Sequence, residues 1–210
     1  MNPFLVLDVE TGGLNPEETP MTEIAFNIYD PKNYKLIESY QTYIQPYNDL
    51  VIDMKVLAKT QVTMQDIEGG KTIDVVMKEI TGIWCKYNKV KKNKLIMVGH
   101  NIPFDIRFVK YAFDYKMANL YDFIDESHFC TQRLMKFAER KDKNADKLLY
   151  RLAACCDRMG ISLKNAHGAQ ADIQATFDLF KKLTINIGQT GDTYESTNSK
   201  RDPARNFFEF

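Results

Sequence analysis

The feature that most constrains the fold of this chain is an apolar run that ends in two carboxylates and a glycine turn. Residues 4–7, Phe-Leu-Val-Leu, have the character of a buried strand, and Asp8, Glu10 and a glycine pair follow at once. Because residues two apart on a strand point to the same side, Asp8 and Glu10 are predicted to lie side by side. Two carboxylates 4 Å apart repel by roughly 4 kcal/mol at an effective dielectric constant near 20, which a divalent cation would relieve. The alternative is a solvated strand end that runs into a turn.

A second acidic position follows a second predicted strand. Residues 95–99 are apolar, and Pro103, shortly after them, suits the first turn of a helix. Asn101 and Asp105 are four residues apart, so a helix that begins near Asn101 would place both on one face, near the end of the strand. The structural alternative is that Asn101 caps the helix and Asp105 complements its dipole.

The third position combines a histidine and an acid. The spacing of apolar residues after Ala169 predicts a helix that contains Asp172. His167 is five residues earlier, which on a continuous helix corresponds to about 140° of separation. We therefore expect His167 in the loop before the helix, from which its imidazole could reach a metal bound by Asp172. A capping or solvent-exposed histidine is the alternative, and it needs no particular spacing to an acid.

These three positions together resemble the DEDDh 3′-to-5′ exonucleases, which include the proofreading subunits of polymerases and related ribonucleases. The resemblance covers residues 4 to about 185, and Asp-Val-Glu-Thr-Gly-Gly-Leu, His-Asn-Ile-Pro-Phe-Asp and the His167–Asp172 pair carry it. It implies an α/β, RNase H-like fold with a mixed five-stranded sheet flanked by helices. A sister class places tyrosine four residues before the last aspartate, where this chain has Gly168, so the histidine class is indicated.

The resemblance also implies a mechanism. Two divalent cations about 3.5–4 Å apart can activate a water, stabilise the leaving 3′-oxygen and compensate charge at phosphorus. Oxygen-only ligands favour Mg²⁺ or Mn²⁺ over zinc. The predicted metal ligands are Asp8, Glu10, Asp105 and Asp172. His167 is predicted to be the general base, because its reference pKa near 6.5 suits proton transfer close to neutral pH.

Contacts to the terminal nucleotide are implied in the same way. The predicted substrate-binding residues are Thr11, Gly12, Leu14, Asn101 and Phe104. The backbone near Thr11 and Gly12 would approach the sugar and Leu14 would wedge against the base, whereas core packing is the alternative for Leu14 and Phe104. Many relatives carry His or Asn before a Gly between the first two motifs. Residues 59–63, Lys-Thr-Gln-Val-Thr, lack that pattern, which leaves the choice between DNA and RNA open.

Hydrophobic periodicity and turn residues predict one α/β domain. Strands are expected near residues 4–8, 22–29, 36–44, 95–99 and 128–131. Helices are expected near residues 50–58, 72–88, 103–117, 132–140, 145–158 and 169–186.

Composition favours an ordinary globular protein of the cytoplasm. The chain is 44% apolar and 27% charged, and it shows neither a signal peptide nor a run long enough to span a membrane. Its four cysteines lack metal-ligand spacing and are expected to be reduced. Because its net charge is zero, contact with nucleic acid would need local basic patches, such as the lysines of residues 86–94 and the basic residues of 136–147. The alternative for residues 86–94 is a solvated turn.

The end of the sequence differs from the rest. We expect an exonuclease domain at residues 1–187 and a flexible tail at 188–210, where apolar residues are scarce until Phe207, Phe208 and Phe210. The aromatic end is similar to the short peptides with which replication proteins hold a sliding clamp, so a clamp or a polymerase is the predicted partner. The alternative is that these rings pack back on their own domain.

The leading functional prediction is a metal-dependent exonuclease that removes nucleoside 5′-monophosphates from the 3′ end of single-stranded DNA, in proofreading or replication. An exoribonuclease acting on RNA ends or short oligoribonucleotides is the close alternative, because one fold serves both. A non-catalytic clamp-binding or polymerase-binding module is disfavoured, because all five active-site positions are intact.

Overall fold

A computed structural model describes residues 2–88, 94–144, 148–163 and 169–190 of the chain, with side chains as far as Ile185. His167 and the aromatic residues of the tail lie outside these described residues. The elements are β1 (Phe4–Thr11), β2 (Met21–Tyr29), β3 (Leu36–Tyr43), α1 (Met54–Leu57), α2 (Met64–Glu68), α3 (Ile73–Cys85), β4 (Leu95–Gly99), α4 (Pro103–Tyr115), the short 3₁₀ helix η1 (Leu120–Asp122), β5 (Ile124–Cys130), α5 (Thr131–Ala138), α6 (Leu152–Arg158) and α7 (Ala169–Thr190).

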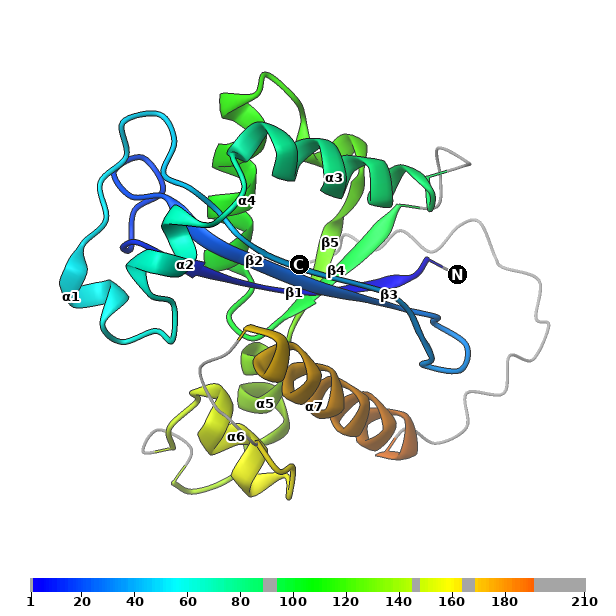
Figure 1. Ribbon diagram of the computed structural model, residues 1–210. Coiled ribbons are helices and arrows are strands. Elements are labelled where there is room, and N and C mark those ends of the chain that lie inside the picture. Colours follow the sequence, from blue (N-terminus) through cyan, green and yellow to red (C-terminus); the bar gives the residue numbers. More distant parts are fainter. Residues whose placement is uncertain (1, 89–93, 145–147, 164–168, 191–210) are drawn as a thin grey trace, which may run out of the picture.

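The strands form one five-stranded sheet in the order β3-β2-β1-β4-β5. β1 and β2 are antiparallel, as are β2 and β3, whereas β1 runs parallel to β4 and β4 runs parallel to β5. Helices α3 and α4 lie on one side of the sheet and α5, α6 and α7 on the other (Figure 1). The predicted mixed five-stranded sheet flanked by helices is confirmed.

The central strand β1 contributes to both faces of the sheet by simple alternation. Leu5, Leu7 and Val9 point toward the α3 and α4 side and belong to the larger core cluster. Trp84 of α3 and Phe113 of α4 are in the same cluster, with their rings stacked 5.8 Å apart between centroids. The side chains at odd-numbered positions of β1 therefore pack in the larger core, and those at even-numbered positions face α7.

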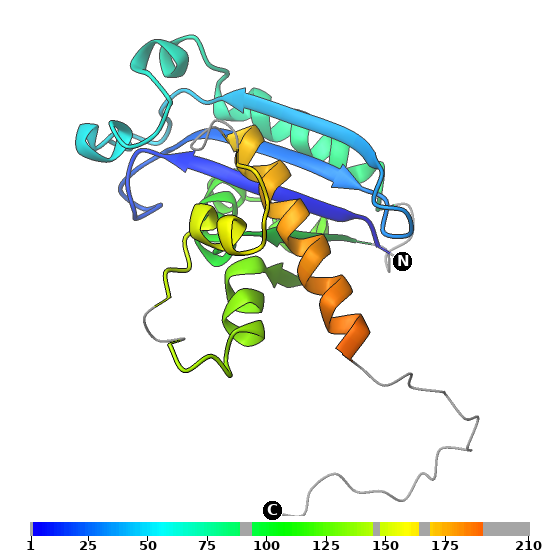
Figure 2. The same ribbon diagram turned by 90° about the horizontal axis from the view of Figure 1, so that it is seen from below.

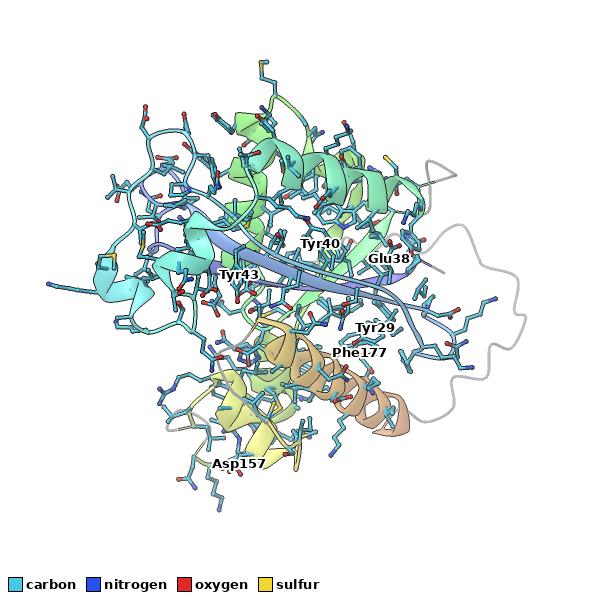
Figure 3. The ribbon with its side chains drawn as sticks, viewed as in Figure 1. Tyr29, Glu38, Tyr40, Tyr43, Asp157 and Phe177 are labelled. Atoms are coloured by element: carbon cyan, nitrogen blue, oxygen red, sulfur yellow. The ribbon has the colours of Figure 1, made fainter. Side chains whose placement is uncertain are left out.

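Helix α7 covers the opposite face and lies across the strands, as the view from below shows (Figure 2). Val6 of β1 and Ala25 of β2 form a second core cluster with Ile173 and Phe177 of α7. The ring of Tyr29 stacks on Phe177 with 3.5 Å between centroids, and both side chains lie at the boundary of α7 and the sheet (Figure 3). This cluster fixes the side of α7 that faces β1.

Several boundaries differ from those predicted. β5 begins at Ile124 rather than near residue 128, and α6 begins only at Leu152, after the gap at residues 145–147. The sequence analysis missed α2, which begins with a capping box between Thr63 and Asp66. α7 continues past the predicted end at residue 186 to Thr190.

Two smaller expectations concern cysteines and membranes. The adjacent Cys155 and Cys156 are buried on α6, and Cys130 is buried as well, whereas Cys85 is exposed. Among the described residues, no helix is both long and apolar enough to cross a membrane.

Replacing Phe177 by Ala should destabilise the protein strongly, because the side chain is buried between α7 and the sheet. We expect a loss of about 3–5 kcal/mol in the free energy of unfolding, measured by urea denaturation. Val75→Ala on α3, where the side chain is exposed, is the control and should cost no more than about 0.5 kcal/mol. Equal losses in the two variants would contradict this description of the core.

Candidate active site

The site lies at the carboxyl end of β1, where this strand pairs with only one of its two neighbours. The parallel pairing of β1 with β4 extends only from Phe4 to Val6, whereas its pairing with β2 continues to Thr11. Asp8 and Glu10 lie beyond the last β4 partner and on the same face as Val6, which packs against α7. Diverging strand ends of this kind leave a crevice in which α/β proteins commonly bind ligands.

Asp105 closes this crevice from the side of α4. It lies in the first turn of the helix, is 4% exposed, and its Oδ1 accepts a hydrogen bond of 3.1 Å from the backbone N–H of Val9. This N–H belongs to the residue between Asp8 and Glu10, in the part of β1 that β4 no longer pairs. The hydrogen bond therefore anchors the second predicted motif directly on the first.

The fourth carboxylate comes from α7, where Asp172 lies in the first turn. Burial raises the pKa of Asp8 well above its ordinary value, and repulsion from Asp105, Glu10 and Asp172 raises it further. The structure thus brings together four predicted carboxylates from three separate elements, close enough for each to act on the ionisation of Asp8.

A fifth acid, Glu23 of β2, was missed by the sequence analysis. It is the cross-strand partner of Glu10, is 3% exposed, and its Oε1 accepts a hydrogen bond of 2.6 Å from Gln41 Nε2. Burial raises the pKa of Glu10 to about 7, with further repulsion from Glu23 and Asp172. Like charges directly opposite each other destabilise a sheet, so the pair is not explained by stability. The signal that could have revealed Glu23 is a charged residue within β2, a strand that is buried along its whole length.

The donor set fits a hard divalent cation. The converging ligands are carboxylate oxygens, which Mg²⁺ and Mn²⁺ prefer, and the raised pKa values reflect negative charge that a cation would compensate. In the described part of the chain, no three His, Cys, Asp or Glu side chains already stand in metal-ligand geometry. Mutual repulsion keeps bare carboxylates apart, so closer convergence is expected only with a cation between them.

The predicted general base, His167, lies outside the described residues, so its role stays a prediction. His100, one of the histidines that the structure does describe, has a structural role instead. Its Nδ1 lies 2.9 Å from Thr131 Oγ1 and its Nε2 lies 2.8 Å from the carbonyl oxygen of Tyr150. Burial lowers its pKa, which keeps the ring neutral near pH 7. His100 thus ties the end of β4 to α5 and to the segment before α6.

The glycine turn after β1 is tightly organised. Thr11 is buried and its hydroxyl donates to the carbonyl of Gly13 at 2.6 Å. Gly12 donates its N–H to Pro20 at 2.8 Å and accepts from the N–H of Asp53 at 2.7 Å. The Gly12 amide and carbonyl therefore already hold the turn together, and their predicted contact with a sugar stays a prediction. A Cβ at Gly12 would lie 3.1 Å from Pro20 Cδ, so the close packing at this position is with the chain itself.

The other predicted substrate contacts differ in their exposure. Leu14 is 72% exposed, which excludes core packing for it. Phe104 is half-buried against the larger core, with its ring centroid 5.0 Å from that of Phe108.

Asn101 lies before the helix, which begins at Pro103 as predicted, so the shared helix face expected for a start near Asn101 does not form. Asn101 has a φ of 64° and is exposed, and it does not share a face of α4 with Asp105. The reason is the tight turn between β4 and α4, where asparagine tolerates the left-handed conformation.

The two predicted basic patches are only partly described. Lys86 forms an ion pair of 2.7 Å with Glu38, which agrees with the alternative of a surface turn, while residues 89–93 lie outside the described residues. In the second patch, Lys136 lies over the ring of Tyr150, and Lys147 is outside the described part of the chain.

Comparison with known proteins now decides the family. The profile of the RNase T family, described as exonucleases, matches residues 5–180. The chain belongs to this exonuclease family. The resemblance predicted from the sequence is therefore confirmed for most of the chain, and members of this family depend on metal ions.

Individual relatives agree. The 3′-5′ exonuclease DinG of Staphylococcus aureus is 28% identical over 192 residues, which are 88% of this chain and 19% of DinG. The chain thus spans about a fifth of that relative. A crystal structure of E. coli Exonuclease I with a dT13 oligonucleotide has a TM-score of 0.75 at 24% identity, over 90% of this chain and 42% of Exonuclease I. A zinc-bound complex of the same enzyme with single-stranded DNA has a TM-score of 0.75 at 20% identity, over the same shares of each chain. These likenesses confirm the fold.

The raised pKa of Glu10 predicts that the protein without bound metal becomes less stable as the pH rises. Glu10 has a pKa near 4.5 when unfolded and about 7 when folded, so the folded state holds more protons between these values. The free energy of unfolding in EDTA should therefore fall as the pH rises through this window, as measured by urea denaturation. Glu10→Gln should flatten the dependence and Mn²⁺ should reduce it. Greater stability in EDTA at about pH 8 than at about pH 5, with the same slope in Glu10→Gln, would contradict the described electrostatics.

Proposed function

We propose that this exonuclease hydrolyses the terminal phosphodiester of single-stranded DNA from the 3′ end with the help of two divalent cations, Mg²⁺ or Mn²⁺, and releases nucleoside 5′-monophosphates. The observation that carries the proposal is the convergence of carboxylates from β1, α4 and α7, among which Asp8, Glu10 and Asp105 have raised pKa values. DinG is named a 3′-5′ exonuclease, and E. coli Exonuclease I was crystallised with single-stranded DNA, which supports the polarity and the substrate.

The residues divide the work of such a reaction. When bound, divalent cations supply charge compensation at the phosphate and lower the pKa of a water. Asp8, Glu10, Asp105 and Asp172 would hold them. The N–H of Val9 orients the Asp105 carboxylate. His167 would accept the proton of the attacking water, as the resemblance implies.

The strand end would reach this site past the turn after β1. Leu14 projects into solvent from that turn and is suited to contact the terminal base. Thr11, Gly12, Asn101 and Phe104 remain proposed contacts of the same nucleotide. A role in replication or proofreading is part of the proposal, and the likeness of the motifs to proofreading subunits supports it.

Asp105→Asn should abolish hydrolysis, because it removes a ligand charge while the amide oxygen can still accept from Val9. We expect a loss of at least about 10³-fold in the rate, of the order that a lost charge-stabilising group costs, on a 5′-labelled DNA oligonucleotide with Mg²⁺ or Mn²⁺. Asp157→Asn on the exposed side of α6 (Figure 3) is the matched control and should retain full activity. Wild-type activity in Asp105→Asn would refute the proposed mechanism.

The same assay on matched RNA separates the leading proposal from its alternative. We expect a ladder of products from single-stranded DNA, shortened from the 3′ end. A ladder from RNA alone would replace the DNA assignment by an exoribonuclease, and shortening from the 5′ end would overturn the polarity.

The segment predicted as a tail at residues 188–210, whose first three residues continue α7, is proposed to tether the enzyme domain at 1–187 to a replication partner, a sliding clamp or a polymerase. Phe207, Phe208 and Phe210 follow a stretch with few apolar residues, and this clustering of aromatic residues supports the proposal. Deleting residues 205–210 should leave hydrolysis of short oligonucleotides unchanged and weaken binding to the clamp of the source organism in a pull-down assay. Unchanged clamp binding together with a large fall in melting temperature would instead show that these rings pack on their own domain.

A further inference from the structure

Helix α7 meets the sheet with two different strips of side chains. One strip is apolar, with Ala169, Ile173 and Phe177 at intervals of four residues against β1, β2 and β4. The other strip is polar, with Gln170 and Gln174 against β2 and β3. Their partners Asn27 and Tyr29 are buried, and a buried amide or phenol needs a hydrogen-bond partner to offset its lost hydration.

The first contact of the polar strip lies next to the active site. Gln170 Nε2 donates to Asn27 Oδ1 at 2.9 Å and to Ser39 Oγ at 3.2 Å. Asn27 is 2% exposed, stands in the middle of β2, and is the cross-strand partner of Val6. Gln170 precedes Asp172 by two residues, so this contact holds the turn of α7 that carries Asp172.

The second contact lies one turn further along α7. Asn27 Nδ2 donates to Tyr29 Oη at 3.1 Å, and Tyr29 Oη donates to Gln174 Oε1 at 3.2 Å. The network therefore offers two hydrogen-bonded positions on the same helix, one two residues before Asp172 and the other two residues after it. Because Asn27 holds the first position and Tyr29 the second, the two contacts can be removed one at a time.

The apolar strip alone leaves the axial position of α7 weakly defined. Hydrophobic contacts are non-directional and tolerate small slides or rotations of a helix over a sheet. Hydrogen bonds are directional and short-ranged, so a fixed donor–acceptor pair selects one position. Small displacements matter here, because the Asp172 carboxylate must meet Asp8 and Glu10 from another element.

We propose that Asn27 and Gln170 are a positioning pair for the metal site. Their hydrogen bond sets the first turn of α7 against β2 and thereby places the Asp172 carboxylate opposite Asp8 and Glu10. Neither residue touches substrate or metal in this role, and each acts through Asp172. The inference rests on the proposed function, since it assumes that these carboxylates bind divalent cations.

The test is direct binding of Mn²⁺ to the full chain, measured by isothermal titration calorimetry without nucleic acid. Gln170→Met keeps the length of the side chain and the helix propensity but removes the amide. We expect its Mn²⁺ affinity to fall about tenfold, the lower end of the range seen when groups that orient metal ligands are lost. The rate of DNA hydrolysis should fall at limiting Mg²⁺ and recover at saturating Mg²⁺.

Tyr29→Phe is the matched control. It removes both hydrogen bonds of Tyr29 Oη and leaves the contact between Asn27 and Gln170 in place. We expect a lower melting temperature with unchanged Mn²⁺ affinity. Asn27→Leu should reproduce the effect of Gln170→Met, and the double variant should bind Mn²⁺ no more weakly than either single variant.

The outcomes separate the two claims. If the wild type binds no Mn²⁺, the proposed function itself fails. If the wild type binds Mn²⁺ and both Gln170→Met and Asn27→Leu bind it equally well, the function stands and the positioning pair is overturned. An equal loss of affinity in Tyr29→Phe would also overturn it, because the effect would then follow helix stability rather than this contact. Should Gln170→Met fail to fold, Asn27→Leu alone decides between the same outcomes.

Discussion

The fold holds several carboxylates together at the end of β1 against their mutual repulsion, and the rest of the structure must offset this unfavourable interaction. Burial and neighbouring charges raise the pKa of Asp8, Glu10 and Asp105, so the unliganded site opposes the ionisation of its own groups. A protein that needed only stability would disperse these acids or pair them with lysines. Rigid elements with large apolar cores hold them in place instead, and a divalent cation is the natural counter-charge.

Strand pairing explains why the acids meet at this point. β1 pairs with β2 along its whole length, whereas its pairing with β4 ends at Val6. The backbone N–H of Val9, beyond that point, donates a hydrogen bond to the carboxylate of Asp105. Asp172 comes from α7, which covers the face of β1 on which Asp8 and Glu10 lie. Alternation along β1 directs its odd-numbered apolar residues into the core and its even-numbered acids toward α7. Groups from three elements thus meet where the pairing of β1 with β4 has ended.

Much of this architecture could be predicted from local patterns. The apolar run before Asp8, the strand at 95–99 and the proline at the start of α4 are signals carried by neighbouring residues, and each was placed correctly. The left-handed turn at Asn101 was not predicted, because the sequence around it fits a helix start equally well. The extra carboxylate Glu23 was also missed, since its relation to Glu10 exists only through the register of β1 and β2. Contacts such as that between Asn27 and Gln170 join residues 143 positions apart, so no pattern of neighbouring residues in the sequence predicts them.

The central claim is that the converging carboxylates form a site for two divalent cations. Crystals soaked with Mn²⁺ and a nucleoside monophosphate would test it most directly through anomalous difference density. The account predicts two peaks about 3.5–4 Å apart, bounded by the carboxylates of Asp8, Glu10, Asp105 and Asp172. Density at other surface acids, with none between these four, would contradict it.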